Sequence, residues 1–243
     1  MNSFSPKMDP LNPAPKKSRE LPPLPEPPKP FVGQEQMGIL RERMVETQLK
    51  ARGIIDKAVL DLLGRLPRHL FVDPSMVDLA YSDGPLPIGF GQTISQPYIV
   101  AFMTETLALT PEDRVLEIGS GCGYQTAVLA SLAQEVYAVE LLPGLFDQGR
   151  ANIKKLGFQN VWAKHGDGSL GWPEMAPFTA IVAAAYGSRT PRRLLDQLSP
   201  GGRLLMPLGE PESQSLVLFR KAKDGRVTSR SILGCRFVPL VGG

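Results

Sequence analysis

The sequence has only two cysteines and two histidines among its 243 residues. Cys122 and Cys235 lie far apart and outside any C-x-x-C spacing, which argues against a disulfide framework and a zinc knuckle. His69 and His165 have no second His or Cys at metal-ligand spacing, so we expect no metal site and structural roles for both. This cysteine usage is typical of a reducing compartment, and we expect a cytoplasmic protein.

The chain also lacks a long apolar run and a surplus of charge of one sign. Its longest uncharged stretch, residues 84–104, is broken by six glycines and prolines, and the N-terminus has prolines and lysines where a secretory signal has an apolar region. Residues 31–243 hold 22 basic and 21 acidic side chains. We therefore expect no membrane span, no export and no nucleic-acid partner.

Proline is concentrated at the N-terminus: residues 1–30 hold 10 of the 24 prolines. Such a segment favours polyproline II and buries too little apolar surface to offset the entropy cost of ordering. We predict a disordered proline-rich tail over residues 1–30 and one domain over residues 31–243. The P-x-x-P spacings of the tail leave open docking on an aromatic groove, although a solvated extension is the simpler interpretation.

The first part of the domain has the pattern of helices. Apolar side chains recur at helical spacing over residues 34–51, and Gly53 follows as a C-cap. Asp56 can cap a second helix that ends before Pro67, and a third helix is predicted over residues 97–109.

From residue 114 onward, short apolar runs alternate with helical segments, which predicts a parallel sheet with helices on both faces. Asp224-Gly225 indicates a hairpin, so the last strands should be antiparallel. The predicted fold class is α/β and Rossmann-like: a mostly parallel sheet with antiparallel C-terminal strands and an N-terminal helical preface. The predicted strands span residues 115–118, 136–139, 161–164, 178–185, 203–206, 215–219 and 227–233, and the helices between them span residues 124–133, 145–156 and 191–198.

A glycine-rich loop follows the first of these strands. Its sequence, Glu117-Ile-Gly119-Ser-Gly121-Cys-Gly123-Tyr124, leads directly into a helix, and open α/β sheets bind ligands at this end of a strand. The dinucleotide fingerprint G-x-G-x-x-G needs its third glycine at position 124, where this chain has tyrosine. The spacing therefore disfavours NAD.

Charge around the loop separates two cofactors. Glu117 would oppose a pyrophosphate but suits the ammonium and sulfonium groups of S-adenosylmethionine, which the glycines let the backbone approach closely. Glu140 ends the next strand, where an acid accepts the ribose hydroxyls of adenosine in either cofactor. Asp167, after the third strand, can accept the adenine amino group, although the tetrapeptide around it alone indicates only a turn. Ordinary solvated acids are the alternative interpretation of both glutamates.

An uncharged segment, Pro85–Pro97, precedes this part of the chain. Its glycines and prolines predict a fixed, irregular path, and a long ordered loop ahead of a cofactor domain is a functional candidate. The alternative is a connector whose Thr93 and Ser95 cap the following helix.

Five segments together resemble the protein-L-isoaspartate O-methyltransferase family. The glycine loop is shared with many methyltransferases, whereas Thr93–Pro97 and Phe237–Leu240 are more specific. The resemblance implies a class I methyltransferase fold, S-adenosylmethionine as cofactor, and methylation of the free carboxyl of L-isoaspartyl residues in damaged proteins and peptides, which initiates their repair. The five segments are Gly91–Pro97, Val115–Tyr124, Gly166–Gly168, Leu198–Leu204 and Arg236–Leu240.

The resemblance also implies roles for individual residues. Ser95 matches the active-site serine of the family, which contacts the substrate. The other matching positions are Thr93 and Ile94 beside the cofactor, Glu117, Gly119, Gly121 and Gly123 in the methionine-binding loop, Glu140 at the ribose, Asp167 and Gly168 at the adenine, and Val238, Pro239 and Leu240 in the segment that holds the substrate peptide.

Two positions depart from the family pattern. Thr179 stands where aspartate is common, and Ala184-Ala-Tyr186 stands where an alanine-rich run is followed by proline. Bulk at Tyr186, beside the substrate mouth, would alter the accepted peptide or the rate.

We expect a monomer. The rival hypotheses are a nicotinamide oxidoreductase, a nucleic-acid methyltransferase, a methyltransferase for another carboxylate or small molecule, and a binding protein without catalysis.

Overall fold

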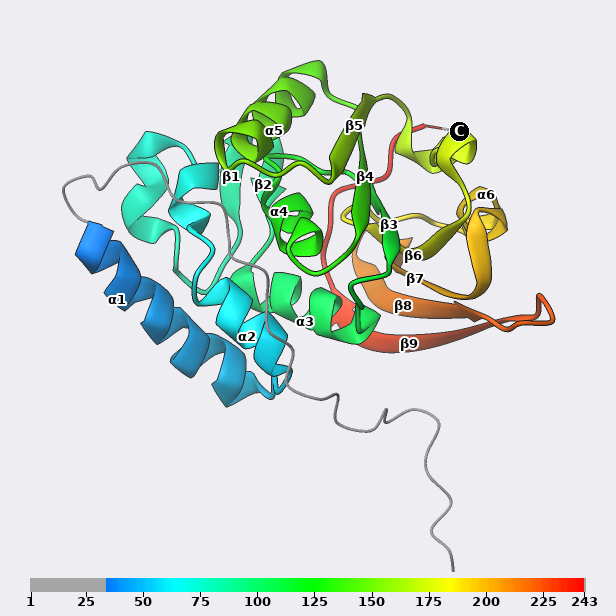
Figure 1. Ribbon diagram of the computed structural model, residues 1–243, viewed down its shortest axis with the longest axis horizontal. Helices are drawn as coiled ribbons and strands as arrows, with labels where there is room; N and C mark the ends of the chain where they lie inside the picture. The colour runs from blue at the N-terminus through cyan, green and yellow to red at the C-terminus, as the bar shows by residue number, and fades with distance from the viewer. Residues whose placement is uncertain (1–33, 243) are drawn as a thin grey trace, which may run out of the picture.

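The computed structural model describes residues 34–242. The predicted tail, residues 1–30, lies outside the described residues. Figure 1 shows a twisted sheet in the centre of the molecule, with the N-terminal helices beside it and the C-terminal strands at its lower edge. Within residues 34–242, no helix is both long enough and apolar enough to cross a lipid bilayer.

Seven strands form the main sheet in the order β5-β4-β3-β6-β7-β8-β9. The pairs from β5 to β7 are parallel, whereas β7, β8 and β9 pair antiparallel. This arrangement confirms the predicted α/β fold with antiparallel C-terminal strands. The strands are β3 (Arg114–Ile118), β4 (Glu135–Glu140), β5 (Val161–His165), β6 (Phe178–Ala183), β7 (Leu198–Glu210), β8 (Ser213–Lys221) and β9 (Val227–Cys235).

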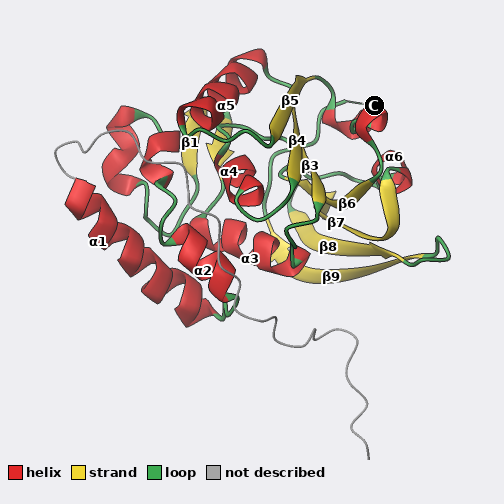
Figure 2. Ribbon diagram, in the orientation of Figure 1, coloured by secondary structure: helices red, strands yellow, loops and turns green. Residues whose placement is uncertain are grey.

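Helices cover the two faces of the sheet unequally. Successive side chains of a strand point to opposite faces, so Val115 joins the larger core, under α3, α4 and α5, while Leu116 joins a smaller core, under α6. Figure 2 shows the helices of the larger layer, in red, between the sheet and the N-terminal part of the chain. The helices of the larger layer are α3 (Pro97–Leu107), α4 (Tyr124–Ala130) and α5 (Pro143–Lys155), and the helix on the other face is α6 (Arg192–Asp196).

The N-terminal preface folds as its capping residues predict. The first helix, α1 (Gln34–Met44), continues through one π-helical and one 3₁₀ turn to Gly53, whose φ of +89° ends it. The Asp56 carboxylate caps α2 (Lys57–Leu63) by accepting hydrogen bonds from two backbone amides, at 2.8 and 3.2 Å. Short 3₁₀ helices occur at Arg68–Phe71, Pro74–Leu79, Gly168–Leu170 and Pro173–Met175.

The prediction of an irregular path over residues 85–97 is wrong. This segment forms a β-hairpin of β1 (Leu86–Gly89) and β2 (Gln92–Ile94), in which Leu86 pairs with Ile94. Leu86 and Ile88 are buried on one face while Pro87 points to solvent, which is the alternation of a strand. The N-cap of α3 is Gln96, whose side chain makes no capping hydrogen bond, so Thr93 and Ser95 do not serve as caps.

Candidate active site

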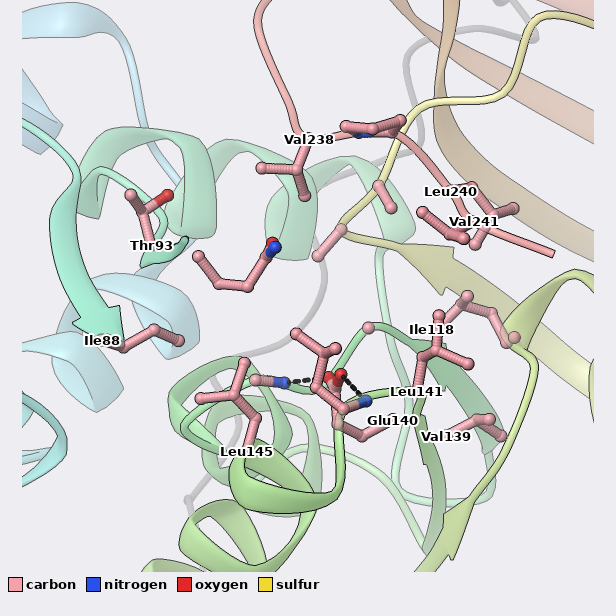
Figure 3. Close-up of a pocket in the computed structure, with 18 residues that line it drawn as sticks. Ile88, Thr93, Ile118, Val139, Glu140, Leu141, Leu145, Val238, Leu240 and Val241 are labelled. Atoms are coloured by element: carbon pink, nitrogen blue, oxygen red, sulfur yellow. Dashed lines mark hydrogen bonds between the residues drawn. The ribbon is translucent and has the colours of Figure 1, made fainter. Parts of the chain in front are cut away.

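A cavity of about 130 Å³ lies at the carboxyl ends of β3, β4 and β6. Its lining comes from the glycine loop, the start of α5, the β1–β2 hairpin, residues 184 and 185 after β6, and residues 238–241 near the C-terminus (Figure 3). This is the edge of an open α/β sheet where ligands bind. The cavity brings together eight of the predicted site residues: Thr93, Gly119, Gly121, Glu140, Gly168, Val238, Pro239 and Leu240.

The glycine loop forms one wall of the cavity. Gly119 and Gly121 line it, and their φ angles of +78° and +54° are in the left-handed region that favours glycine. Helix α5 packs tightly against the outside of the loop, because a Cβ atom on Gly149 would lie 2.6 Å from the carbonyl oxygen of Gly121. The third loop glycine, Gly123, starts α4 and lies against Gly149 rather than at the cavity.

Glu140 joins this wall to the next strand. Its carboxylate accepts a hydrogen bond from the Gly121 amide at 2.8 Å and another from the Leu142 amide at 3.0 Å, drawn as dashed lines in Figure 3. The side chain is buried but lines the cavity. A carboxylate has about four acceptor positions, so Glu140 can still accept hydrogen bonds from a ligand.

Glu117 lies one layer deeper, inside the core of the protein. It is 1% exposed, and neither carboxylate oxygen has a hydrogen-bond partner within residues 34–242. Burial, opposed by the Thr126 hydroxyl and assisted by the nearby Glu140 carboxylate, raises the pKa of Glu117 to about 8. At pH 7 this carboxyl is therefore mostly protonated, and a cationic ligand at the glycine loop would favour its ionised form, whereas a phosphate would oppose it.

The β1–β2 hairpin forms a second wall. Thr93 and Ile88 line the cavity from this hairpin, whereas Ile94 is buried in the core. Ser95 is half-buried and follows Ile94 directly, before α3 begins at Pro97. At the hairpin tip the Phe90 ring occupies the space beside Gly144 of α5, where a Cβ atom would clash with it.

Residues Phe237–Val241, which we call the strap, follow β9 and form a third wall. Val238, Pro239 and Leu240, which the resemblance assigns to the substrate peptide, line the cavity. Figure 1 shows this red segment turning back from the end of β9 and running beside the central strands toward the end of the chain.

The predicted adenine-side pair lies near the end of the strap. Gly168 lines the cavity, and a Cβ atom there would lie 2.5 Å from Ile118 Cγ2, so the position needs glycine. The Asp167 carboxylate accepts a hydrogen bond from the Ser169 amide at 2.8 Å and lies against the backbone of Gly242.

Several lining residues are missing from the sequence prediction. Leu141, Leu142 and Leu145 follow β4 into α5, and their position directly after a strand-ending acid is the pattern that would have identified them. Gln92 faces the cavity from the hairpin, inside a segment that the prediction treated as irregular. Asn152 supports the site from α5, since its Nδ2 donates to the Cys122 carbonyl at 2.9 Å.

The two departures from the family pattern lie in different places. Thr179 is at the far end of β6 from the cavity, where its hydroxyl accepts a hydrogen bond from the Arg114 amide at 2.9 Å. Tyr186 follows the cavity-lining residues Ala184 and Ala185, and its peptide groups bond to the strap. Of the two departures, only Tyr186 therefore lies next to the cavity.

The surroundings of the two histidines and of the loop cysteine indicate structural roles. His69 Nδ1 lies 2.7 Å from Tyr81 Oη, and burial, with a lesser contribution from the nearby Arg41 charge, lowers the pKa of His69 to about 4. His165 Nε2 lies 2.9 Å from the Leu141 carbonyl oxygen. Cys122 is buried, which raises the pKa of its thiol to about 11 and leaves it a poor nucleophile.

Comparison with known proteins identifies a family for this chain. A sequence model of the protein-L-isoaspartate(D-aspartate) O-methyltransferase family matches residues 40–243. A protein-L-isoaspartate O-methyltransferase of Trichlorobacter lovleyi is 52% identical over 204 residues, covering 84% of this chain and 94% of the relative. One of Methylorubrum extorquens is 53% identical over 204 residues, covering 84% and 89%.

Solved structures of similar fold indicate the same family. A protein-L-isoaspartate O-methyltransferase superposes with a TM-score of 0.75 at 30% identity, covering 84% of this chain and 66% of the other. A Plasmodium falciparum structure described as the same kind of enzyme, in complex with S-adenosyl-L-homocysteine, gives a TM-score of 0.73 at 26% identity and covers 83% and 98%. The fold, the cavity at the carboxyl ends of the strands and these likenesses lead to one conclusion: the chain belongs to the protein-L-isoaspartate(D-aspartate) O-methyltransferase family.

Proposed function

We propose that this chain transfers a methyl group from S-adenosylmethionine to the free carboxyl of L-isoaspartyl residues in damaged proteins and peptides, and so initiates their repair. The observation that carries the proposal is the single cavity in which the glycine loop and Glu140 meet Thr93 and the strap. Relatives about 50% identical over more than four-fifths of the chain bear the name of this activity.

The residues of the cavity fit S-adenosylmethionine on three grounds. Gly119 and Gly121 present bare backbone to the cavity, and Glu140 retains acceptor positions for ribose hydroxyls. Glu117 supplies a buried carboxyl without a hydrogen-bond partner among the described residues, and a cation bound at the loop would lower its pKa and favour its charged form. We assign Gly119, Gly121 and Gly123 to the methionine-binding loop, Glu140 to the ribose, Asp167 and Gly168 to the adenine end, and Thr93 and Ile94 to the hairpin side.

S-adenosylmethionine, when bound, supplies an electrophilic methyl group on a positively charged sulfur. The acceptor carboxyl is ionised at pH 7, about three units above the usual pKa of a carboxyl group, so the protein needs no general base. Its tasks are to orient the carboxylate and to strip water from it. We assign the first task to Ser95, whose hydroxyl can donate one hydrogen bond, and a share of both to Val238, Pro239 and Leu240.

The uncharged hairpin suits this chemistry. Residues 84–104 carry no Asp, Glu, Lys or Arg. A fixed anion beside the acceptor would repel the substrate carboxylate, and a fixed cation would stabilise it as a poorer nucleophile. Ser95 instead orients the carboxylate with a neutral donor.

We also propose that residues 31–243 form one methyltransferase domain that acts as a monomer in the cytoplasm, without nucleic-acid or membrane partners. The family match from residue 40 to residue 243 supports the extent of the domain. The near balance of 22 basic and 21 acidic side chains over residues 31–243 supports the exclusion of nucleic acid.

Methyl transfer from labelled S-adenosylmethionine to an isoaspartyl peptide tests the proposal, with the aspartyl peptide of the same sequence as control. We expect label in the isoaspartyl peptide only, in a base-labile ester. Equal labelling of both peptides would instead favour a broader carboxyl methyltransferase. No labelling of either, with intact cofactor binding, would contradict the proposed substrate.

A further inference from the structure

The strap lines the cavity but belongs to no strand of the sheet. The last strand, β9, ends at Cys235, and Val238–Val241 contribute to the cavity wall. Pro239 in its middle has no amide hydrogen to donate. The position of this wall therefore depends on the bonds that other elements make to the strap.

Gln214 fastens the first residue of the strap. Its backbone pairs with Gly209 and Cys235 inside the sheet, while its side-chain amide reaches beyond the end of β9. The Phe237 amide donates to Gln214 Oε1 at 2.7 Å, and Gln214 Nε2 donates to the Phe237 carbonyl at 3.3 Å. This buried side chain thus supplies the two hydrogen bonds that a neighbouring strand would supply.

Tyr186 fastens the middle of the strap through its backbone. Its amide donates to the Val238 carbonyl and its carbonyl accepts from the Leu240 amide, both at 2.8 Å. These two bonds form a parallel bridge between Tyr186 and Pro239. The next residue, Gly187, is bonded to Pro207 and Gly209 at 3.1 and 3.0 Å, so the bridge is anchored to β7.

We propose that Gln214 and Tyr186 are positioning residues that hold the strap at the site. Neither is among the residues that line the cavity, so neither acts by touching a ligand there. Together they hold the strap through four hydrogen bonds, two between Gln214 and Phe237 and one each from Tyr186 to Val238 and Leu240. The effect on catalysis rests on the proposed function. The hydrogen bonds that hold the strap can be measured whether or not that function is correct.

Three variants separate the backbone bonds from the side chains. Tyr186→Pro removes one amide donor to the strap, whereas Tyr186→Ala keeps both backbone bonds and loses only the ring. Gln214→Leu removes both side-chain bonds to Phe237 at similar volume. If Tyr186→Pro does not fold, Gln214→Leu and Gln214→Glu, which keeps an acceptor for the Phe237 amide, give the same comparison at the other end of the strap.

Hydrogen exchange at the Leu240 and Phe237 amides is the first measurement, and calorimetry with S-adenosylhomocysteine is the second. We expect Tyr186→Pro and Gln214→Leu to speed exchange at the strap at least about 10-fold. In the same two variants, loss of a net hydrogen bond should weaken the binding of S-adenosylhomocysteine about 2- to 10-fold. We expect a similar rise in KM for an isoaspartyl peptide and a smaller change in kcat. In Tyr186→Ala, the Leu240 and Phe237 amides should exchange at the wild-type rate.

Wild-type exchange at the strap in both Tyr186→Pro and Gln214→Leu would overturn the proposal. So would equal effects of Tyr186→Ala and Tyr186→Pro, because the ring rather than the amide would then be responsible. A wild-type protein that methylates no isoaspartyl peptide contradicts the proposed function alone. The fastening is still supported in that case if exchange and S-adenosylhomocysteine binding change as expected.

Discussion

The two sides of the cavity are held in place by different means. The glycine loop is fixed by its neighbours in sequence and by backbone contact with α5, where Gly149 approaches Gly121 closely. The tip of the hairpin and the first residue of the strap are held by side chains, namely the Phe90 ring on Gly144 and the Gln214 amide on Phe237. The loop side therefore depends on close packing of backbone against backbone. On the hairpin and strap side, single substitutions can remove the side-chain contacts.

This difference suggests a division of labour. A site that encloses its ligand must open to exchange it, and mobile elements come from regions with few buried contacts. The loop side carries Glu140 and the bare glycines that line the cavity and that we assign to the cofactor. We expect changes on the loop side to weaken cofactor binding, and changes on the hairpin and strap side to alter the rates of ligand exchange and the substrate affinity.

The largest effect is expected from Gly149→Ala. The added methyl group would meet the Gly121 carbonyl oxygen at 2.6 Å, so backbone must move. Overpacking of this kind costs about 1–3 kcal/mol, which corresponds to a fall of up to about 100-fold in S-adenosylhomocysteine affinity by calorimetry. The control is Gly38→Ala in α1, where a Cβ atom meets nothing within 4 Å and affinity should not change. Equal affinity of Gly149→Ala and wild type would show that the loop tolerates displacement.

Ser95→Ala is expected to lower kcat about 10- to 100-fold, since hydrogen bonds to charged groups contribute about 1.5–3 kcal/mol. Affinity for S-adenosylhomocysteine should change less than about twofold, because Ser95 is assigned to the substrate. Steady-state kinetics with an isoaspartyl peptide and calorimetry measure the two quantities. Ser229→Ala, at an exposed position of β9, is the control. Parallel losses in turnover and cofactor affinity would refute the role assigned to Ser95.

Glu140→Ala is expected to weaken S-adenosylhomocysteine binding by about 10-fold or more. It removes the ribose acceptor and also frees the Gly121 and Leu142 amides that the carboxylate holds. Glu112→Ala, an exposed acid just before β3, should bind as the wild type does. An unchanged dissociation constant for Glu140→Ala would rule out the ribose contact.

Phe90→Ala tests the hairpin side. The Phe90 side chain is 63% exposed overall but its ring packs on Gly144, and burying apolar surface contributes about 0.8 kcal/mol per CH₂ group. Stopped-flow measurement should show S-adenosylhomocysteine leaving about 2- to 10-fold faster, with little change in unfolding. Leu79→Ala, at another exposed apolar residue, is the control. A release rate equal to that of the wild type would mean that the hairpin tip does not restrain the cavity.

The last prediction concerns the free energy of unfolding, and its dependence on pH, rather than ligand binding. Because burial raises the pKa of Glu117 to about 8 in the folded protein, the carboxyl stays protonated there while it ionises in the unfolded chain from about pH 4.5. The free energy of unfolding should therefore fall as pH rises from about 4.5 to about 8, relative to Glu117→Gln, and then level off. Urea unfolding of both proteins between pH 4 and pH 9 measures this, with Glu112→Gln as control. A difference that does not vary with pH would contradict the buried, protonated state.

The sequence is informative where structure is local. The strand, glycine loop and helix over residues 114–130 were predictable because their glycines, capping and apolar periodicity act within a few residues. The hairpin was not, because Pro85 and Pro87 masked the alternation of Leu86 and Ile88. The fastening of the strap by Gln214 and Tyr186 could not be read from the chain, since each bond joins residues more than 20 positions apart.

The most direct test is a crystal structure of the protein with S-adenosylhomocysteine. We predict that the ligand lies between the glycine loop and the strap, with its ribose hydroxyls on Glu140 and its adenine beside Gly168. A ligand bound elsewhere on the protein, or one whose ribose does not reach Glu140, would contradict the account.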